Sequence, residues 1–189
     1  MEPPGNSLAP TLLLAMPQLR DRNFSRTVVL LCEYGTNGAF GFVVNRPTDV
    51  RAADAVVLDP PAQGDSGLML WTGGPVESQR GFLLLGETPG MGESERIADG
   101  LHLTASVEVL RWLLECPVTE MSSRRARLLL GYAGWGPGQL DEELTASAWL
   151  TAPPDPGLVF DTPPEAMWER AIRGLGVDPM ALQLGAGVQ

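Results

Sequence analysis

The chain has 189 residues, of which 44% are hydrophobic and 19% charged, the size and composition of one soluble domain. Its formal net charge is −10 and all 13 basic residues are arginine, a balance that disfavours binding to nucleic-acid phosphate. No apolar run approaches the roughly 18 residues of a membrane span, and the short apolar start lacks the layout of a signal peptide, so we expect a cytoplasmic protein without a membrane segment.

The first part of the chain predicts three strands. Leu12–Met16 is the first, and the β-branched and aromatic runs 27–34 and 39–45 are the next two. Between these two runs, Gly35-Thr36-Asn37-Gly38 predicts a hairpin turn, because Asn and Gly tolerate positive φ. Pro47 lacks a backbone N–H and is expected to stop the ladder.

The middle of the chain alternates apolar runs with loops. Residues 49–58 predict a short helix, and residues 59–67 a flexible surface loop. Leu68–Trp71 predicts a strand whose partner is the apolar run Gly81–Leu85. Residues 87–95 combine Pro, Gly and acidic side chains, and predict a second flexible loop.

Two helices and two strands are predicted after the second loop. Leu101–Thr104 is a short strand, and Ser106 is the N-cap of a helix that runs through Glu115. Ala126–Leu130 predicts a buried strand that leads into a glycine-rich segment. A helix over residues 139–148 follows, with apolar side chains at four-residue spacing.

The C-terminal part predicts a strand and a helix. Leu158–Phe160 is interpreted as a last short strand. Thr162-Pro163-Pro164-Glu165 predicts a capping box with proline at the first helical position. The core-facing side chains of the helix are expected to be Trp168, Ala171, Ile172 and Leu175.

The intermixed strands and helices predict a compact single domain of the α/β class, α+β in type, with a mixed sheet and packed helices. A regular doubly wound fold would alternate strand and helix throughout. The expected organisation is a flexible N-terminus over residues 1–11, a folded domain over 12–176 and a short C-terminal tail over 177–189.

The signatures of common enzymes are missing from the sequence: it has no GxSxG elbow, no phosphate loop and no HExxH. Gly134–Gly138 does not make a dinucleotide fingerprint, because Pro137 and Leu140 break the pattern. The acidic run Asp141–Glu143 suits the start of a helix and would repel a phosphate there.

Single titratable side chains do not form a catalytic set. Cys32 and Cys116 are interpreted as small buried thiols. A metal site would need more ligands, and His102 is the only histidine in the sequence. Glu142 and Glu143 are adjacent, so on a helix they point about 100° apart and are not a natural acid–base pair. No catalytic residue, metal or cofactor is therefore assigned.

Three short motifs follow predicted strands: Asn45-Arg46-Pro47, Gly73-Gly74-Pro75 and Gly134–Gly138. If these strand ends meet at one edge of the sheet, their loops line a concave region in which Arg46 and Arg80 could bind an anion. The candidate binding residues are Asn45, Arg46, Gly73, Gly74, Arg80, Tyr132, Trp135 and Gln139. The alternative is that the glycines only turn the chain and that Trp135 fills the core.

Several motifs occur in a characteristic order: Ala15-Met16-Pro17-Gln18-Leu19, Cys32-Glu33, Gly41 to Pro47, Gly73-Gly74-Pro75-Val76, Arg80-Gly81-Phe82, Gly131 to Leu144, and Trp149-Leu150. They resemble the AlgH/YqgE family of bacterial proteins over about residues 12–175. The resemblance implies a cytoplasmic α/β protein with a mixed, partly barrel-like sheet. It also implies a family label of transcriptional regulator, although the sequence shows no helix-turn-helix.

The chain departs from the family at two positions. Family members often carry histidine where this sequence has Tyr34 and Leu85. A family mechanism that needs either imidazole is therefore not expected here.

Three functions compete. The leading hypothesis is a non-enzymatic binding or regulatory protein that holds a small anion or a protein partner. The second is an enzyme of hydrolase type that uses acids near Glu33 or Glu142. The third is a transcriptional regulator that contacts DNA directly through Arg124, Arg125 and Arg127, which the acidic net charge disfavours.

Overall fold

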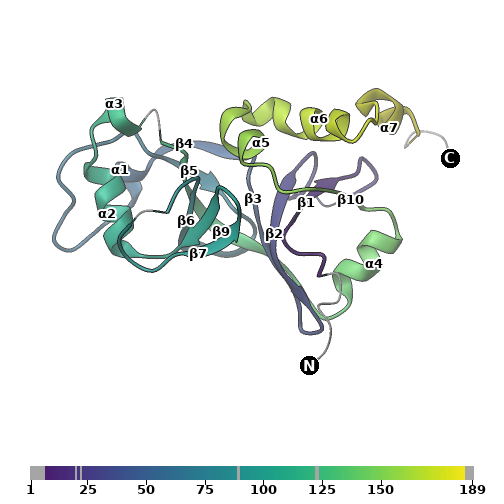
Figure 1. Ribbon diagram of the computed structural model, residues 1–189, viewed down its shortest axis with the longest axis horizontal. Coiled ribbons are helices and arrows are strands. Elements are labelled where there is room, and N and C mark those ends of the chain that lie inside the picture. Colours follow the sequence, from purple (N-terminus) through teal and green to yellow (C-terminus); the bar gives the residue numbers. More distant parts are fainter. Residues whose placement is uncertain (1–6, 20, 22, 89, 122–123, 186–189) are drawn as a thin grey trace.

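The computed structural model describes residues 7–19, 21, 23–88, 90–121 and 124–185 (Figure 1). Within this part of the chain, one ten-stranded sheet curls into a half-barrel and helices pack against it. The main strand order is β10-β1-β2-β3-β9-β6-β8-β7, and the pair β4–β5 branches from β9. No described helix combines the length and the hydropathy that a bilayer-spanning segment requires.

The strands are β1 (Thr11–Ala15), β2 (Val28–Gly35), β3 (Gly38–Val43), β4 (Pro47–Arg51), β5 (Met69–Thr72), β6 (Val76–Leu85), β7 (Glu95–Ala98), β8 (Leu101–Thr104), β9 (Ala126–Trp135) and β10 (Trp149–Ala152). The helices are α1 (Ala52–Ala55), α2 (Val107–Glu115), α3 (Val118–Met121), α4 (Gln139–Thr145), α5 (Pro156–Asp161), α6 (Pro164–Gly174) and α7 (Pro179–Gly185). All pairs of strands are antiparallel except the parallel pair β5–β9.

Strand β9 joins the two halves of the sheet. Its first half pairs with β5 and β6, and its second half pairs with β3. Between the halves lies Gly131, whose φ of 70° is a left-handed conformation that favours glycine. The strand therefore bends at Gly131 and carries the sheet from one half to the other.

The bend in β9 lies against Gly73 and Gly74, which connect β5 to β6. A Cβ atom on Gly74 would lie 2.1 Å from the carbonyl carbon of Tyr132, and one on Gly131 would lie 2.4 Å from the oxygen of Gly74. Backbone therefore packs directly on backbone at this crossing, which leaves no room for side chains.

Helices cover both faces of the curled sheet (Figure 1). Buried side chains of α2 pack with those of β5, β6 and β9 in one apolar cluster, and those of α5 and α6 pack in another with β1, β2 and β3. A third cluster joins α4 to the strands at the β1–β2–β3 end. These layers bury the apolar stripes of the amphipathic helices, which is where most helix stability in proteins originates.

Arg127 is a buried cation at the centre of the sheet. Its side chain donates to the backbone oxygen of Val44 at 2.5 Å and to that of Val159. Its guanidinium also lies 3.7 Å from the centroid of the Trp71 ring. Burial lowers the pKa of Arg127 to about 10, so the side chain stays charged at neutral pH. Arg127 thereby links β9 to β3, β5 and α5.

The structure confirms the predicted fold class, and it confirms most of the predicted strands. The hairpin of β2 and β3 turns where Gly35–Gly38 predicts it. Ser106 caps α2, because its hydroxyl accepts from the Val109 N–H. The helix predicted after Pro164 is α6, although Leu175 at its end is exposed rather than in the core stripe.

Other predictions about local structure are wrong. Leu158–Phe160 belongs to helix α5, because Asp155 caps it and Pro156 occupies its first turn. Thr162 does not cap α6; its hydroxyl donates to the oxygen of Gly157. The ladder of β3 does end before Pro47, as predicted, but Pro47 also begins a new strand, β4, which the sequence did not predict. Strand β6, which includes Gly81–Leu85, pairs with β8 and β9 and not with β5.

The glycine-rich segment is also more regular than predicted. Residues 131–135 continue β9, so the turn before α4 is limited to residues 136–138. The predicted C-terminal tail contains α7. Residues 1–6 of the predicted N-terminal segment and residues 186–189 of the tail lie outside the described part of the chain.

We expect Gly74→Ala to lower the free energy of unfolding by about 2–5 kcal/mol, because its φ of 156° is strained for alanine and the new Cβ would overlap the backbone of Tyr132. The matched control is Gly35→Ala, since nothing lies within 4 Å of its Cβ position. The control should change stability by less than about 0.5 kcal/mol. Urea unfolding measures both; equal effects would contradict the role given to the crossing.

Candidate functional site

The side chains of Asn45 and Arg46 in the first predicted binding motif form hydrogen bonds within the fold. The Asn45 side chain accepts from the Val28 N–H at 2.9 Å and donates to the oxygen of Arg26 at 3.0 Å. The Arg46 guanidinium donates to the oxygen of Ser25 at 3.0 Å. Both side chains therefore fasten the segment before β2 to the end of β3.

Two of the three predicted motifs meet in space. The Thr72 N–H donates to the oxygen of Arg46 at 2.9 Å, and the Val43 N–H donates to that of Gly73 at 2.7 Å. The third motif lies elsewhere, because Trp135 and Gly136 contact Gly38 in the β2–β3 hairpin. The structure therefore brings two of the motifs together and places the third at the β2–β3 hairpin.

Trp135 and Gln139 belong to a hydrogen-bond network around Glu143. The indole N–H groups of Trp135 and Trp149 both donate to Glu143 Oε2, at 2.9 and 2.7 Å. The Gln139 amide donates to Glu143 Oε1 at 3.0 Å and accepts from the Gly136 N–H at 3.1 Å. Trp135 is buried, so this network holds α4 against the sheet and satisfies indole groups that would otherwise lack partners.

Tyr132 and Arg80 lie at a cluster of aromatic rings on the inner face of the sheet. The rings of Tyr132 and Phe40 are 4.9 Å apart between centroids, and those of Phe42 and Phe82 are also 4.9 Å apart. The Arg80 guanidinium lies 5.0 Å from the centroid of the Phe82 ring and pairs with Glu77 at 3.0 Å. This cluster leads from the predicted site residues to a cleft that Phe82 also lines.

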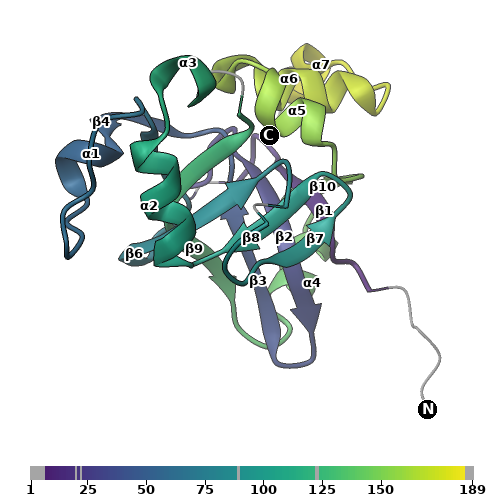
Figure 2. The same ribbon diagram turned by 60° about the vertical axis from the view of Figure 1, so that its left-hand side comes forward.

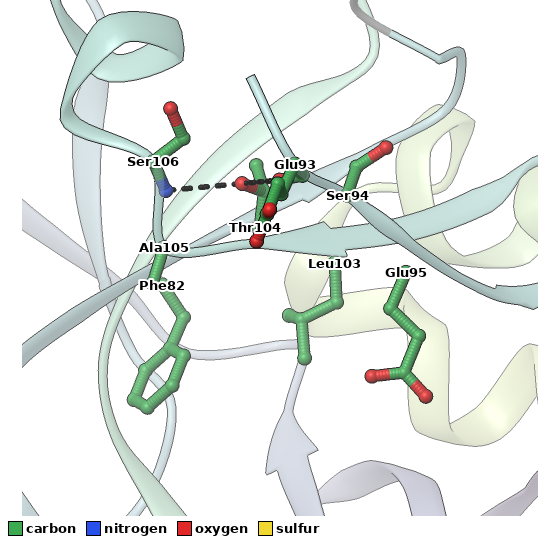
Figure 3. Close-up of a pocket in the computed structure, with 8 residues that line it drawn as sticks. All are labelled: Phe82, Glu93, Ser94, Glu95, Leu103, Thr104, Ala105 and Ser106. Atoms are coloured by element: carbon green, nitrogen blue, oxygen red, sulfur yellow. Dashed lines mark hydrogen bonds between the residues drawn. The ribbon is translucent and has the colours of Figure 1, made fainter.

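That cleft, which we call the mouth, has a volume of about 660 Å³. It is lined by Phe82, Glu93, Ser94, Glu95, Leu103, Thr104, Ala105 and Ser106 (Figure 3). Its volume lies in the range of small-molecule and peptide side-chain sites. None of its lining residues comes from α5 or α6, so the mouth lies where those helices leave the inner face uncovered.

Glu95 lies on the apolar inner face of the sheet. It pairs across the ladder with Leu103, which in turn pairs with Leu84, and cross-strand partners share a face. Figure 3 shows Glu95, Leu103 and Phe82 extending to the same side. A carboxylate thus lies beside apolar side chains at the rim of the half-barrel.

Two carboxylates, Glu93 and Glu95, line the mouth, and a third, Glu33 on β2, lines the separate cleft that also contains Cys32. Within the described residues, none of the three carboxylates has an ion pair or a side-chain hydrogen bond. The mouth therefore combines an apolar floor with carboxylates that form no ion pair within the described residues.

Cys32 is a protonated thiol. Burial, together with the carboxylates of Glu95 and Glu33, raises its pKa from 9.0 to about 12. Its sulfur donates to the oxygen of Leu30 at 3.6 Å. The thiolate that a nucleophile or a metal ligand requires is thus strongly disfavoured.

Other groups considered from the sequence have structural contacts. The Tyr34 hydroxyl donates to the carboxylate of Asp141. Arg125 pairs with Asp161, and the Arg124 guanidinium lies 4.3 Å from the centroid of the Trp112 ring. In the described part of the chain, no group of three His, Cys, Asp or Glu side chains is arranged to hold a metal ion.

Sequence reasoning missed the mouth. Residues 87–95 were predicted to be a loop, so Glu95 was not placed on a strand. The available signal was the alternation of Glu95 and Ile97 in the short run Glu95–Ala98, which places both on one face of a strand.

Comparisons with known proteins agree with the fold. The AlgH-like family model matches residues 12–180. A UPF0301 protein of Methylobacterium sp. (strain 4-46) is 41% identical over 187 residues, covering 93% of this chain and 87% of the relative. One of Ruegeria pomeroyi is 38% identical over 180 residues, covering 93% and 96%.

Two solved structures are similar. The solution structure of the AlgH protein from Pseudomonas aeruginosa has a TM-score of 0.75 and 34% identity, with 100% of both chains covered. The crystal structure of a Corynebacterium diphtheriae protein has a TM-score of 0.66 and 23% identity, covering 100% of this chain and 95% of that one. The second likeness concerns the fold alone.

We expect Glu143→Ala to lower the free energy of unfolding by about 1–3 kcal/mol, because two indole N–H groups and the Gln139 amide lose their acceptor. Glu142→Ala on the same helix is the control, since Glu142 is exposed and should change stability by less than about 0.5 kcal/mol. Chemical unfolding followed by circular dichroism measures both. A Glu143 variant as stable as the control would show that the network is not structural.

We expect native Cys32 to resist alkylation at pH 8, measured by iodoacetamide labelling and mass spectrometry in a Cys116→Ala background. A rise in pKa from 9.0 to about 12 lowers the thiolate fraction about 1000-fold relative to the unfolded chain. The raised pKa stabilises the fold fully below pH 9 and this contribution is lost as the pH rises through 12. Equal labelling rates before and after denaturation would contradict this account.

Proposed function

The chain belongs to the AlgH-like family, and from this premise we propose that it is a non-enzymatic binding protein with a regulatory role. Its binding site is the mouth, and its ligand carries a cationic group next to an apolar one. The protein works in the cytoplasm; its two cysteines, which are free, suit a reducing compartment.

The placement of Glu95 carries this proposal. A carboxylate on the apolar face of a strand, without a cationic partner in the described residues, is poised to receive a positive charge from outside. Phe82 and Leu103 beside it offer apolar contact area to the rest of the ligand. An amine or guanidinium on an apolar stem matches both features.

The non-enzymatic part of the proposal is supported by how the reactive groups are used. Glu143 accepts from two tryptophans, Arg127 is bound to backbone oxygens, and Cys32 is held protonated. Each of these groups has a role in folding. The described residues that line the mouth include no histidine or cysteine, and the hydroxyls of Thr104 and Ser106 are hydrogen-bonded to the backbone.

A regulatory role through another protein fits the structure better than direct DNA contact. Arg127 is 5% exposed, and Arg125 is engaged with Asp161, so the arginine cluster considered for DNA is largely committed to the fold. The net charge of −10 and the acidic mouth favour a basic partner.

We expect phenethylamine to bind the mouth more tightly than its anionic analogue 3-phenylpropionate, because only the amine complements Glu95. Titration followed by amide chemical-shift changes at the mouth measures both affinities. Glu95→Gln should weaken phenethylamine binding by about tenfold or more, the value of one charge-assisted hydrogen bond.

Glu165→Gln is the matched control, because Glu165 is an exposed acid on α6 and its substitution changes the net charge equally. It should leave the affinity within about twofold. Equal weakening by both variants, or tighter binding of 3-phenylpropionate, would overturn the proposed site. Tighter binding of 3-phenylpropionate would favour an anion-binding site at Arg46 and Arg80 instead.

A further inference from the structure

We infer that the mouth receives an extended basic segment of a partner protein, which adds as a strand to the outer edge of β7. This inference rests on the proposed function and names the form of its ligand. It follows from the position of β7 in the sheet, from an open edge of β2 that borders the same apolar cluster, and from the charges at the two edges.

Strand β7 is the last strand on its side of the sheet (Figure 2). It pairs with β8 only, and within the described residues its outer edge makes no backbone hydrogen bond to another strand. An edge strand presents N–H and C=O groups that can pair with a further strand. A peptide laid along β7 would satisfy these groups directly, which a small amine cannot do.

Strand β2 offers a second open edge. Its ladder with β1 ends at the pair Thr11 and Leu31, so Cys32–Gly35 pair with β3 only. A second cleft of about 430 Å³ lies at this edge and is lined by Cys32, Glu33 and Tyr34 together with Ser7 and Ala9 from the segment before β1. Cys32 of β2 and Ile97 of β7 pack against the same apolar cluster, so the open edges of β7 and β2 both border that cluster.

The side chains at the two edges define the partner. Glu95 extends from β7 on the inner face, Glu33 belongs to β2, and Glu93 lines the mouth before β7. Side chains of an added strand alternate between two faces. On the inner face, arginine or lysine would reach the carboxylates with its charged end, and its apolar stem would contact Phe82 and Leu103.

The edge of β7 also limits the length of the partner segment. The strand has four residues, and its register shifts between Arg96 and Ala98. Short strands and bulges protect an edge against indiscriminate pairing. A short basic segment would therefore pair with β7, because its charge complements the carboxylates there. Neutral or acidic strands would not pair, and this difference gives selectivity.

The experiment uses the whole protein and the acetylated hexapeptide Arg-Val-Arg-Val-Arg-Val, with Glu-Val-Glu-Val-Glu-Val for comparison. Two further basic peptides carry N-methyl groups on either the odd or the even residues, so that each lacks the N–H donors of one strand edge. Isothermal titration calorimetry measures affinity for the unchanged protein, for Glu95→Gln and for Glu165→Gln. Amide hydrogen exchange measures protection of residues 95–98.

We expect the basic peptide to bind and the acidic one not to bind. At least one N-methylation pattern should weaken binding by about tenfold or more, and the amides of β7 should exchange more slowly in the complex. Glu95→Gln should weaken binding similarly, whereas Glu165→Gln should not.

Two results would contradict different claims. If both N-methylated peptides bind as well as the parent and still depend on Glu95, strand addition is wrong and the proposed function stands. If no basic peptide binds, or if binding ignores Glu95→Gln, the proposed function itself fails and the inference fails with it.

Discussion

The close approach of backbone to backbone at Gly73, Gly74 and Gly131 is the constraint on which the rest of the structure depends. It lets β9 bend and serve both halves of the sheet, because no side chain separates the crossing segments. The bend sets the curl of the half-barrel. The curl in turn brings β7 and the free end of β2 to the same apolar cluster, so the surroundings of the mouth are set far from the mouth itself.

Arg127 reinforces this arrangement four residues before the bend. A buried guanidinium without a carboxylate is costly unless its donors are satisfied, and here backbone oxygens and the face of Trp71 take that role. The cation and Glu95 lie in one lateral row of the inner face, separated by Leu84 and Leu103. The interior charge is therefore held by the fold, while the charge at the rim is left to meet solvent or a ligand.

Local sequence patterns predicted the elements whose periodicity and caps are self-contained. The β2–β3 hairpin, the cap of α2 at Ser106 and the helix after Pro164 are examples, and the fold class followed from them. Predictions were wrong where distant contacts decide. Leu158–Phe160 was misassigned for a local reason instead, because Asp155 and Pro156 start a helix in spite of the strand-like residues that follow. The mouth was missed because Glu95 matters only once β7 is known to end the sheet, and no local pattern reports strand order. Gly73 and Gly74 were noticed correctly as unusual, but close packing explains them without a ligand.

The network around Glu143 has a consequence for how relatives should be compared. Residues 131–144 form the motif that identifies the family most readily. They make the bend of β9 and the hydrogen bonds that attach α4 to the sheet. Two proteins that share this signature thus share an architecture, and the signature carries no information about what either one recognises. Divergence in specificity should be sought in the short, unremarkable run Glu93–Ala98 and in Cys32–Gly35, where a single changed charge can redirect recognition without disturbing the scaffold.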